Sequence, residues 1–423
     1  MHPEGISNAP AISKTKNPNE IVGLGVIGVG GQGTRLLRWA KEVPGVEIRA
    51  VNDIWDQRLE AAIQESGNPK VAAYSRYTDL LADKSLDAVI IATPDHLHVP
   101  VSLDAADAGL HIYCEKAMST SLEQAKTLRD KIKGSNIRFQ LGHNGRGSAM
   151  LFRSREIYTS GTLGTVTYVR TSYFRNSNVG EWRSQPPPAC TPEHVDWQQF
   201  LGPAPSRPFD PRRYLDWRCY WDYGTGIAGD LLSHSLDSVN FVMSTGCPQS
   251  CVTTGGIHFW KDGRETPDHW NAVFDWPDRK LCVTFSCLFN NAHWGGNYFG
   301  SSLQFFGKEA TLEMNARHLS LYPEEPSPRY EDFFTELREK WGMQPDETFR
   351  TREIPPVYQW EQDDNRYKSS SHIRNFVDAI RYGTALNCDI DDAFEEAVTV
   401  MMSVEAFQRE RKVFWDPVKQ EIA

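Results

Sequence analysis

Three titratable side chains recur at helical spacing in the segment WDYGTGIAGDLLSHSLDSVNFVM. Asp230, His234 and Asp237 stand at positions i, i+4 and i+7, so an α-helix would place them on one face. A carboxylate beside a histidine fixes its tautomer and raises its basicity, which suits a general base for an alcohol proton. An ordinary polar helix face has the same spacing, so the spacing alone leaves both interpretations open.

Polar side chains also follow two apolar runs that are typical of buried strands. Thr93, Pro94 and His96 come after DAVIIA, and Glu115 and Lys116 come after HIYC. The carboxyl ends of parallel strands form the edge at which open α/β sheets bind ligands. A lysine at that edge can approach a substrate hydroxyl, and the alternative is a solvated lysine at the start of a helix.

The cluster Asp95, His96 and His98 raises the question of a metal site. Imidazole and carboxylate groups are common metal ligands, but no further His, Asp or Glu set with ligand-like spacing lies nearby in the sequence. We therefore predict no metal.

A glycine-rich turn interrupts the first regular segment, IVGLGVIGVGGQGTRLLRWAKEV. Gly28, Gly30 and Gly33 form a G-x-G-x-x-G between an apolar run and an amphipathic stretch, with Gln32 inside the turn. In a dinucleotide site such glycines allow a tight turn, close approach of backbone to pyrophosphate, and close packing of the following helix. The next apolar run ends in Asp53, whose carboxylate would bind the adenosine ribose and repel a 2′-phosphate. We therefore predict NAD rather than NADP, the alternative being that Asp53 only caps a helix.

Five aromatic residues crowd into the segment YLDWRCYWDY, namely Tyr214, Trp217, Tyr220, Trp221 and Tyr223. Aromatic rings stack on the C–H faces of sugars, but they serve protein cores and interfaces at least as often. Both uses stay open for this run, and Trp221 is the candidate for a sugar contact.

Strand and helix patterns alternate over residues 21–144, which predicts a parallel, doubly wound sheet. From residue 145 onward, alternating segments such as TVTYVRTSYF and KLCVTFSC predict a mostly antiparallel sheet. We expect a flexible tail at 1–20, a dinucleotide-binding domain at 21–144, and a substrate-binding and oligomerisation domain at 145–423. The polar segment near 322–368, with an expected helix at EDFFTELREKWG, is predicted to be an inserted lid or subunit contact.

Composition limits the classes of partner. A chain of 423 residues exceeds what one core usually supports, so two domains are expected. The net charge of −10 and the pI near 5.7 argue against a nucleic-acid partner. Apolar runs such as AVIIA are too short to span a bilayer, so no membrane partner is expected. Residues 1–20 lack the apolar core of a signal peptide, which favours a cytoplasmic location, or a periplasmic one if a leader has been removed.

Together these motifs resemble those of the glucose-fructose oxidoreductase / inositol dehydrogenase / rhizopine catabolism (Gfo/Idh/MocA) family. The resemblance rests on GVIGVGGQG, the strand ending in Asp53, TPDHLH, the pair Glu115-Lys116, GHNGR, the G-x-L-G from Gly161, and Asp-x-x-x-His-x-x-Asp from Asp230. The resemblance covers nearly the whole chain from about residue 21. Its sequence features are most similar to those of carbohydrate-acting bacterial members.

The resemblance implies an N-terminal Rossmann domain and a C-terminal α/β domain whose open, mostly antiparallel sheet forms the contact of a homodimer or homotetramer. It implies that Lys116 polarises the reacting hydroxyl, that His234 exchanges its proton, and that Asp230 sets the active geometry. These three residues and Trp221 would contact the substrate. The residues implied to border the cofactor are Thr93, Pro94, His96, Glu115 and Asn144. The sequence departs from the family's usual Glu-Lys-Pro, because Ala117 replaces the proline that restrains the backbone after the lysine.

On this basis we expect an NAD-dependent oxidoreductase acting on a secondary hydroxyl of a sugar, sugar alcohol or glycoside, with a glycoside 3-dehydrogenase as the preferred specific activity. An NAD-dependent glycoside hydrolase is the nearest alternative, because transient oxidation, elimination and re-reduction would use the same residues. A non-catalytic NAD-binding protein is the more distant alternative.

Overall fold

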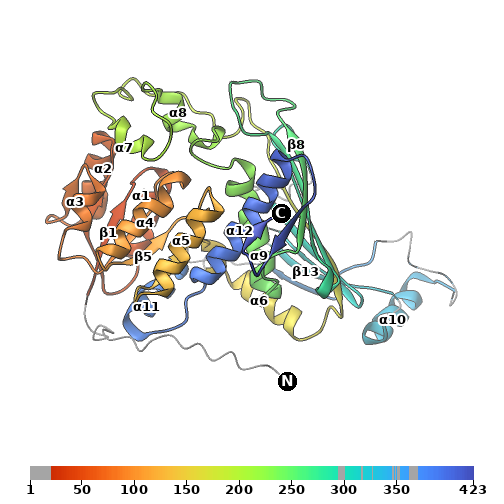
Figure 1. The fold of residues 1–423 in the computed structure, drawn as a ribbon. Coiled ribbons are helices and arrows are strands. Elements are labelled where there is room, and N and C mark those ends of the chain that lie inside the picture. The colour runs from red at the N-terminus through yellow and green to blue at the C-terminus, as the bar shows by residue number, and fades with distance from the viewer. Residues whose placement is uncertain are drawn as a thin grey trace.

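Two sheets with their helices make up the protein in this computed structural model (Figure 1). The structure describes residues 21–293, 301–315, 318–325, 327–344, 347, 349, 353–361 and 370–423. The predicted tail at 1–20 and part of the segment near 322–368 lie outside the described residues. Within the described ranges, no helix has both the length and the apolar character needed to cross a membrane.

The N-terminal sheet has six strands in the order β3-β2-β1-β4-β5-β6, and all neighbouring pairs are parallel. Its strands are β1 (Val22–Ile27), β2 (Val46–Asn52), β3 (Ala72–Tyr74), β4 (Ala88–Ile91), β5 (His111–Cys114) and β6 (Phe139–Leu141). The strand order reverses between β1 and β4, and open sheets bind ligands at such a switch point. The predicted doubly wound Rossmann fold is confirmed.

Helices cover both faces of this sheet, as the fully buried strand β4 requires. They are α1 (Gly31–Lys41), α2 (Asp56–Ser66), α3 (Tyr77–Leu81), α4 (His98–Asp107) and α5 (Leu122–Lys133). Helix α11 (Ser371–Tyr382), from near the end of the chain, returns to pack beside α1. Its Ile373 and Phe376 share a core with Leu24 and Leu36. The last part of the chain thus supports the cofactor-binding half of the molecule.

The second sheet has ten strands, in the order β14-β13-β12-β11-β7-β10-β9-β8-β15-β16. The strands along the chain are β7 (Val166–Phe174), β8 (Ser250–Gly256), β9 (His269–Trp276), β10 (Leu281–Leu288), β11 (Ser301–Gly307), β12 (Ala310–Met314), β13 (His318–Pro323), β14 (Tyr358–Glu361), β15 (Val413–Asp416) and β16 (Glu421–Ile422). Among the described strands of this sheet, only β7 and β10 pair in parallel. This confirms the mostly antiparallel C-terminal sheet.

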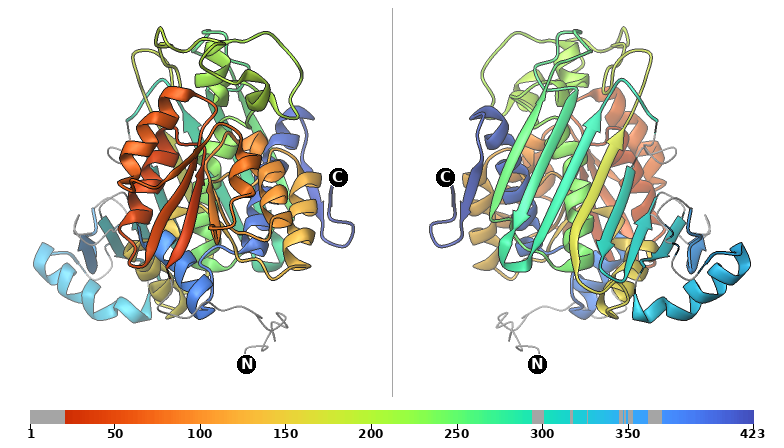
Figure 2. Two further views of the ribbon diagram at one scale, coloured as in Figure 1. Left: turned by 90° about the vertical axis from the view of Figure 1, so that its left-hand side faces the viewer. Right: turned by 90° about the vertical axis from the view of Figure 1, so that its right-hand side faces the viewer.

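One face of the ten-stranded sheet is packed and the other is open. Along β9, Trp270 and Phe274 are buried while Asn271 and Val273 are exposed, which is the alternation of a half-buried strand. The inner face packs against α6 (Ala149–Thr159), α9 (Ser233–Met243) and α12 (Ile390–Gln408). The outer face carries no helix in the described part of the chain (Figure 2, right).

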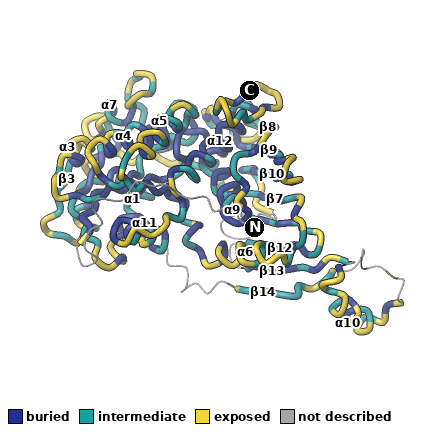
Figure 3. The backbone as a smooth tube through the Cα atoms, turned by 60° about the horizontal axis from the view of Figure 1, so that its bottom comes forward, coloured by how far each residue is buried: buried dark blue, intermediate teal, exposed yellow. Residues whose placement is uncertain are grey.

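Shorter helical elements complete the fold. The helices α7 (Trp197–Leu201) and α8 (Pro211–Leu215) lie in a long connection near the carboxyl edge of the first sheet (Figure 1). Helix α10 (Glu331–Trp341) projects beyond the sheet with its own small apolar core (Figure 3). The 3₁₀ turns are η1 (Asp95–Leu97), η2 (Asn144–Gly147), η3 (Trp217–Cys219), η5 (Pro277–Arg279) and η6 (Pro328–Tyr330), and η4 (Ala228–Leu232) is a π-helical turn before α9.

Candidate active site

The glycine-rich turn between β1 and α1 has the geometry of a dinucleotide cradle. Gly28 adopts φ +81°, a left-handed conformation that other residues rarely adopt, and a Cβ on Gly33 would lie 1.8 Å from the Gly28 carbonyl oxygen. Gly30 precedes the first residue of α1, so the free N–H groups of the helix face the turn. These residues fit the pyrophosphate of a dinucleotide, and the turn admits side chains at neither Gly28 nor Gly33.

Asp53 lies directly below this turn at the end of β2. Its Oδ2 accepts a hydrogen bond from the Val29 amide at 2.8 Å, and its Oδ1 accepts one from the Trp55 amide at 2.9 Å. Burial raises the pKa of Asp53, while Arg58 and the backbone amides act in the opposite direction. Asp53 also lines the cavity described next, so one carboxylate holds the turn and borders the space above it.

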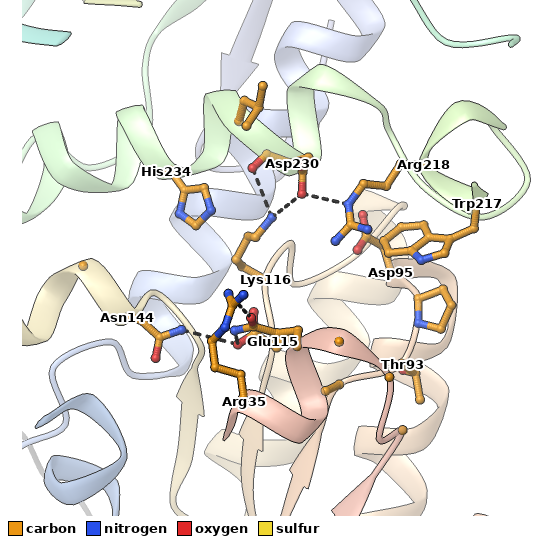
Figure 4. A pocket seen from close by; sticks show the side chains of 18 of the residues that line it. Arg35, Thr93, Asp95, Glu115, Lys116, Asn144, Trp217, Arg218, Asp230 and His234 are labelled. Atoms are coloured by element: carbon orange, nitrogen blue, oxygen red, sulfur yellow. Dashed lines mark hydrogen bonds and ion pairs between the residues drawn. The ribbon is translucent and has the colours of Figure 1, made fainter. Parts of the chain in front are cut away.

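A cavity of about 1390 Å³ extends from the glycine turn to the inner face of the second sheet (Figure 4). The sequence-predicted residues that line it are Gly28, Gly30, Gln32, Asp53, Thr93, Pro94, Glu115, Lys116, Asn144, Asp230 and His234. The structure therefore gathers in one cavity residues from both sheets and from segments far apart in the chain. Gly33 is not at the cavity wall, since it packs against Gly28 beneath the turn.

Glu115 follows directly after β5 and lines the end of the cavity that begins at the glycine turn. Its Oε1 accepts hydrogen bonds from Gln32 Nε2 at 2.9 Å and from Asn144 Nδ2 at 3.4 Å, and Asn144 Oδ1 accepts one from Tyr113 at 2.9 Å. Burial raises the pKa of Glu115, against the opposing effects of Gln32 and Lys116. Three of the predicted cofactor residues thus form one connected group across β5, β6 and α1.

Lys116 and Asp230 meet at the centre of the cavity. Lys116 Nζ donates to Asp230 Oδ1 at 2.8 Å and to the Asp230 carbonyl oxygen at 3.1 Å. Arg218 Nε donates to the same Oδ1 at 2.9 Å, and Trp182 Nε1 donates to Oδ2 at 3.0 Å. Burial opposes ionisation of Asp230, but Arg218 and Lys116 together outweigh it and hold its pKa well below the usual range. Asp230 is therefore an anion that fixes the Lys116 ammonium.

The backbone after Lys116 is anchored from two sides. His98 Nδ1 lies 2.6 Å from the Ala117 carbonyl oxygen, and the Met118 amide donates to Glu396 Oε2 at 3.3 Å. The Lys116–Ala117 peptide bond is cis. His98 and Glu396 thus hold the segment in which Ala117 replaces the family's usual proline.

His234 faces the same cavity from the first turn of α9, beside Lys116 (Figure 4). Burial is the largest cause of its lowered pKa, and the Lys116 ammonium adds to the effect, so the pKa of His234 lies well below its ordinary value. The imidazole is therefore neutral at physiological pH, which is the state that can accept a proton.

The expected polar stripe on one helix face is divided in the structure. Asp230 lies in the π-helical turn η4, whose i→i+5 bonding changes its direction relative to α9. Asp230 and His234 line the cavity, whereas Asp237 is buried behind it and receives two 2.7 Å contacts from Arg146. His234 and Asp237 keep the predicted α-helical spacing within α9, and the structure differs from the prediction at Asp230.

Two further predicted residues lie outside the cavity wall. His96 is buried between the rings of Phe200 and Tyr223, with its Nε2 2.7 Å from the Phe200 carbonyl oxygen. Trp221 packs near Phe407, with ring centroids 6.5 Å apart, and its indole N–H donates to the Glu265 carbonyl at 3.0 Å. Neither side chain lines the cavity, so the cavity gives no support to a cofactor contact of His96 or a sugar contact of Trp221.

Trp217 and Asp95 also lie at the cavity wall, although neither was predicted to be a substrate or cofactor contact. Trp217 lines it with Arg218, whose guanidinium lies 4.2 Å from the Trp217 ring centroid. Asp95 lines it too, and burial raises the pKa of Asp95 to about 7 although Lys116 and Arg218 oppose the shift. The aromatic run and TPDHLH pointed to these segments, but no sequence rule says which side chain in them faces the cavity.

Within the described residues, no group of three or more His, Cys, Asp or Glu side chains is placed to hold a metal ion.

Trp182 adopts φ +63°, a backbone conformation that is uncommon for a residue other than glycine. Such outliers concentrate at functional sites. The surrounding structure therefore holds Trp182 in this conformation, in which its indole N–H donates to Asp230.

Comparison with known proteins identifies two family domains in the chain. Residues 22–143 match the oxidoreductase family's NAD-binding Rossmann fold, and residues 155–253 match its C-terminal α/β domain. An uncharacterised oxidoreductase of Streptococcus pneumoniae is 29% identical over 238 residues, which is 56% of this chain and 54% of that protein.

Two relatives with named activities match shorter segments. The levoglucosan dehydrogenase of Pseudarthrobacter phenanthrenivorans is 27% identical over 193 residues, covering 43% of this chain and 42% of that protein. The inositol 2-dehydrogenase of Salmonella typhimurium is 30% identical over 165 residues, covering 39% of this chain and 48% of that protein. The matches thus span about half the length of these curated relatives.

Solved structures match over almost the whole fold. A levoglucosan dehydrogenase in complex with NADH and levoglucosan superposes with a TM-score of 0.68 at 18% identity, covering 93% of this chain and 99% of that one. A dehydrogenase from Bordetella pertussis in complex with NADH and UDP-GlcNAcA superposes with a TM-score of 0.67 at 16% identity. This match covers 94% of this chain and 99% of that one. At these identities the likeness concerns the fold. With its two family domains in order, the chain belongs to the Gfo/Idh/MocA oxidoreductase family, whose N-terminal domain is an NAD-binding Rossmann fold.

Proposed function

We propose that this protein is an NAD-dependent oxidoreductase that oxidises a secondary hydroxyl of a sugar, sugar alcohol or glycoside, or reduces the corresponding ketone. The observation that carries the proposal is the meeting of Lys116, Asp230 and His234 in the cavity that begins at the glycine turn. The relatives named for levoglucosan and inositol dehydrogenase activity support the same class of substrate.

The residues at the glycine turn and at the strand ends indicate where the cofactor would bind. Gly28 and Gly30 would admit the pyrophosphate, and Asp53 would accept hydrogen bonds from the adenosine ribose. Glu115 and Asn144 would border the nicotinamide end, with Gln32 holding Glu115 in place. When bound, NAD supplies the hydride acceptor for the carbinol carbon.

The substrate hydroxyl would lie between Lys116 and His234. Lys116 donates a hydrogen bond to the hydroxyl oxygen and stabilises the negative charge that develops there as the proton leaves. His234 accepts that proton, which its neutral state allows. Asp230 keeps Lys116 in position, and its contact with Arg218 and Trp182 keeps the carboxylate from moving into the substrate space.

Within this class, we infer a glycoside oxidised at a ring hydroxyl such as C3 as the specific substrate. The support is a stacking surface at the cavity wall, where Trp217 lies beside Arg218. Aromatic rings bind the C–H faces of pyranosides, and the guanidinium supplies hydrogen-bond donors for the neighbouring hydroxyls.

One observation favours a second candidate, the NAD-dependent glycoside hydrolase. That reaction needs a base for a carbon proton next to the transient ketone. Asp95 is a buried carboxyl at the cavity wall, and its pKa of about 7 lets it exchange protons near neutral pH. The dehydrogenase remains the principal proposal because Lys116 and His234 complete it without Asp95.

A substrate panel tests the proposal. The protein is incubated with NAD and, separately, with levoglucosan, myo-inositol, methyl β-glucoside and an aryl β-glucoside, while reduced nicotinamide is followed by absorbance. We expect at least one member to give reduced nicotinamide and a keto product in equal amounts. Tight NAD binding without turnover on any member, and without release of the aryl group, would favour the non-catalytic alternative.

We further propose that the protein forms a homodimer or homotetramer through the open face of the ten-stranded sheet. In the described residues this face is uncovered and carries exposed Val252 and Val273, which lie opposite each other on β8 and β9. Light scattering should give at least twice the 48.0 kDa chain mass, and charged substitutions at both valines should lower it. A monomer at micromolar concentration would contradict this proposal.

A further inference from the structure

A second histidine lies directly behind His234, away from the cavity. His143 follows β6, and its ring meets the His234 ring edge to face, with centroids 5.6 Å apart. The His143 side chain is 1% exposed and does not line the cavity, unlike His234. The two imidazoles therefore connect the substrate side of the site to the buried region between α9 and α12.

Each nitrogen of the His143 ring faces a carboxylate. Nδ1 lies 3.7 Å from Asp237 Oδ2, and Nε2 lies 3.7 Å from Glu396 Oε1. Among the described residues, neither nitrogen has a hydrogen-bond partner, and Glu396 Oε1 has none either. Unpartnered buried polar atoms are uncommon, so this arrangement calls for an explanation. Histidine χ2 is a soft torsion, so a modest ring movement would bring either nitrogen into hydrogen-bond range.

The carboxylates lead onward to the surface. Arg146 holds Asp237 through two 2.7 Å contacts and Asp392 through a third contact of 2.8 Å. The Asp392 side chain is 32% exposed. A small internal cavity lined by Asp237, Glu396 and Asp392 has a volume of about 10 Å³, close to what one water molecule needs. Polar groups thus follow one another from His234 to solvent, and small movements of the His143 ring would close the 3.7 Å gaps to Asp237 and Glu396.

We propose that His143 is a relay residue that takes the proton from His234 and passes it to Asp237 or Glu396, from which it leaves at Asp392. The proposal rests on the proposed oxidation of an alcohol. In each turnover the hydroxyl O–H bond breaks and an N–H bond forms on His234, while the hydride goes to the nicotinamide. The proton then moves from His234 to a His143 nitrogen, and from there to a carboxylate oxygen.

The route has a physical purpose. Once sugar and dinucleotide fill the cavity, the substrate side of His234 is covered, and a proton on it would stop the next oxidation. A path behind His234 lets this proton leave while the cavity is occupied. His143 acts through His234 and touches neither substrate nor cofactor.

The electrostatic surroundings of His143 include groups from every element packed against it. They are Glu115 after β5, Arg146 in η2, His234 and Asp237 in α9, His372 in α11, and Asp392 and Glu396 in α12. Among these, His143 lowers the pKa of His234. Removing His143 should therefore raise the pKa of His234, independently of any substrate.

The test compares His143→Phe, His143→Gln and Glu396→Gln with a matched control, Glu405→Gln. Glu405 lies further along α12, where it forms an ion pair with Arg409 and lines neither cavity. Turnover is measured in water and heavy water with whichever sugar of the panel above gives the highest wild-type rate. Affinity for NADH and the melting temperature are measured alongside.

We expect both His143 variants to lower kcat by at least about tenfold, less than the ~10²–10⁴-fold of a directly acting acid–base group. NADH affinity should stay within about twofold of wild type, the range that a site lacking contact with the cofactor allows. The solvent isotope effect on kcat should increase, because departure of the proton becomes rate-limiting. Glu396→Gln should show a weaker form of the same change, and Glu405→Gln none. A loss of kcat and melting temperature with an unchanged isotope effect would overturn the relay and leave His143 a packing residue.

A second measurement keeps the relay testable if no sugar is turned over, a result that would count against the proposed function alone. The pH titration of His234 is followed by ¹⁵N NMR in the NADH complex of wild type and His143→Gln. We expect the His234 midpoint to rise in the variant. An unchanged midpoint would show that the two imidazoles are not coupled and would overturn the relay.

Discussion

The Lys116 ammonium and the Asp230 carboxylate lie 2.8 Å apart, although 114 positions separate them in the chain. The contact joins the carboxyl edge of the Rossmann sheet to the π-helical turn before α9. The site therefore exists only when both halves of the molecule are docked.

Replacement of Lys116 by methionine should lower turnover by about 10²–10⁴-fold, because the group that stabilises the developing alkoxide is lost. NAD affinity, measured by calorimetry, should stay near the wild-type value, since the glycine turn is unaffected. Lys131→Met is the control, because Lys131 forms an exposed ion pair with Asp107 far from the cavity. Near-normal turnover in Lys116→Met would remove Lys116 from the mechanism.

Replacement of His234 by asparagine should lower turnover over the same range of about 10²–10⁴-fold and leave NAD binding intact. In the wild type, burial and Lys116 hold the pKa of His234 well below its usual value. Because the neutral ring is the active form, kcat/KM should persist as pH falls through about 6.5, the ordinary histidine value. Loss of activity at that pH in a protein that is still folded would contradict the assignment.

Asp95→Asn should stabilise the protein more at pH 8 than at pH 5. Burial raises the pKa of Asp95 to about 7 in the folded state, so the folded protein binds more protons than the unfolded chain between about pH 4 and 7. The stability contribution of this group is therefore present at low pH and is lost as pH rises through 7. Thermal unfolding at both pH values measures the difference. Asp130→Asn, at an exposed position, is the control, and an equal gain at both pH values would contradict burial of the Asp95 charge.

The two tryptophans of the aromatic run should behave differently. Trp217→Ala should raise KM for the sugar, because Trp217 lines the cavity. Trp221→Ala should lower the melting temperature and leave KM unchanged, because its ring packs near Phe407 outside the cavity. An effect of Trp221→Ala on KM alone would reverse the two assignments.

The cofactor preference should be NAD over NADP, because a 2′-phosphate would meet the Asp53 carboxylate. Asp53→Ala should narrow the difference between the two affinities. It should also weaken both of them, since the variant loses the hydrogen bond that holds the Val29 amide in the turn. Calorimetric titration with each cofactor measures both effects, and tighter binding of NADP by the wild type would show that the ribose contact lies elsewhere.

Local sequence patterns were sufficient to predict the Rossmann half and the mostly antiparallel, half-buried strands of the second sheet. The glycines at 28, 30 and 33 have steric requirements that are visible in sequence, and β9 and β10 alternate as half-buried strands should. The return of α11 to the first sheet was not predictable, because an amphipathic pattern says that a helix packs but does not say against which partner.

The site residues were predictable as segments more than as side chains. His96 stands at the correct sheet edge, but the 3₁₀ turn η1 directs it into an aromatic cluster while Asp95 lines the cavity. The π-helical turn at Asp230 likewise breaks the 3.6-residue periodicity from which a shared face with Asp237 was inferred. Such one-residue changes of direction depend on tertiary packing, which spacing rules do not contain.

The most direct measurement of the central claim is the fate of the hydride on an aryl glycoside. The protein is incubated with the glycoside and NAD in heavy water, and reduced nicotinamide, keto-sugar, released aryl alcohol and deuterium in the ring are all quantified. The dehydrogenase account predicts one reduced nicotinamide for each keto-sugar, without release of the aryl alcohol. Release of the aryl alcohol with ring deuteration and no accumulated reduced nicotinamide would contradict it and establish the redox-assisted hydrolase instead.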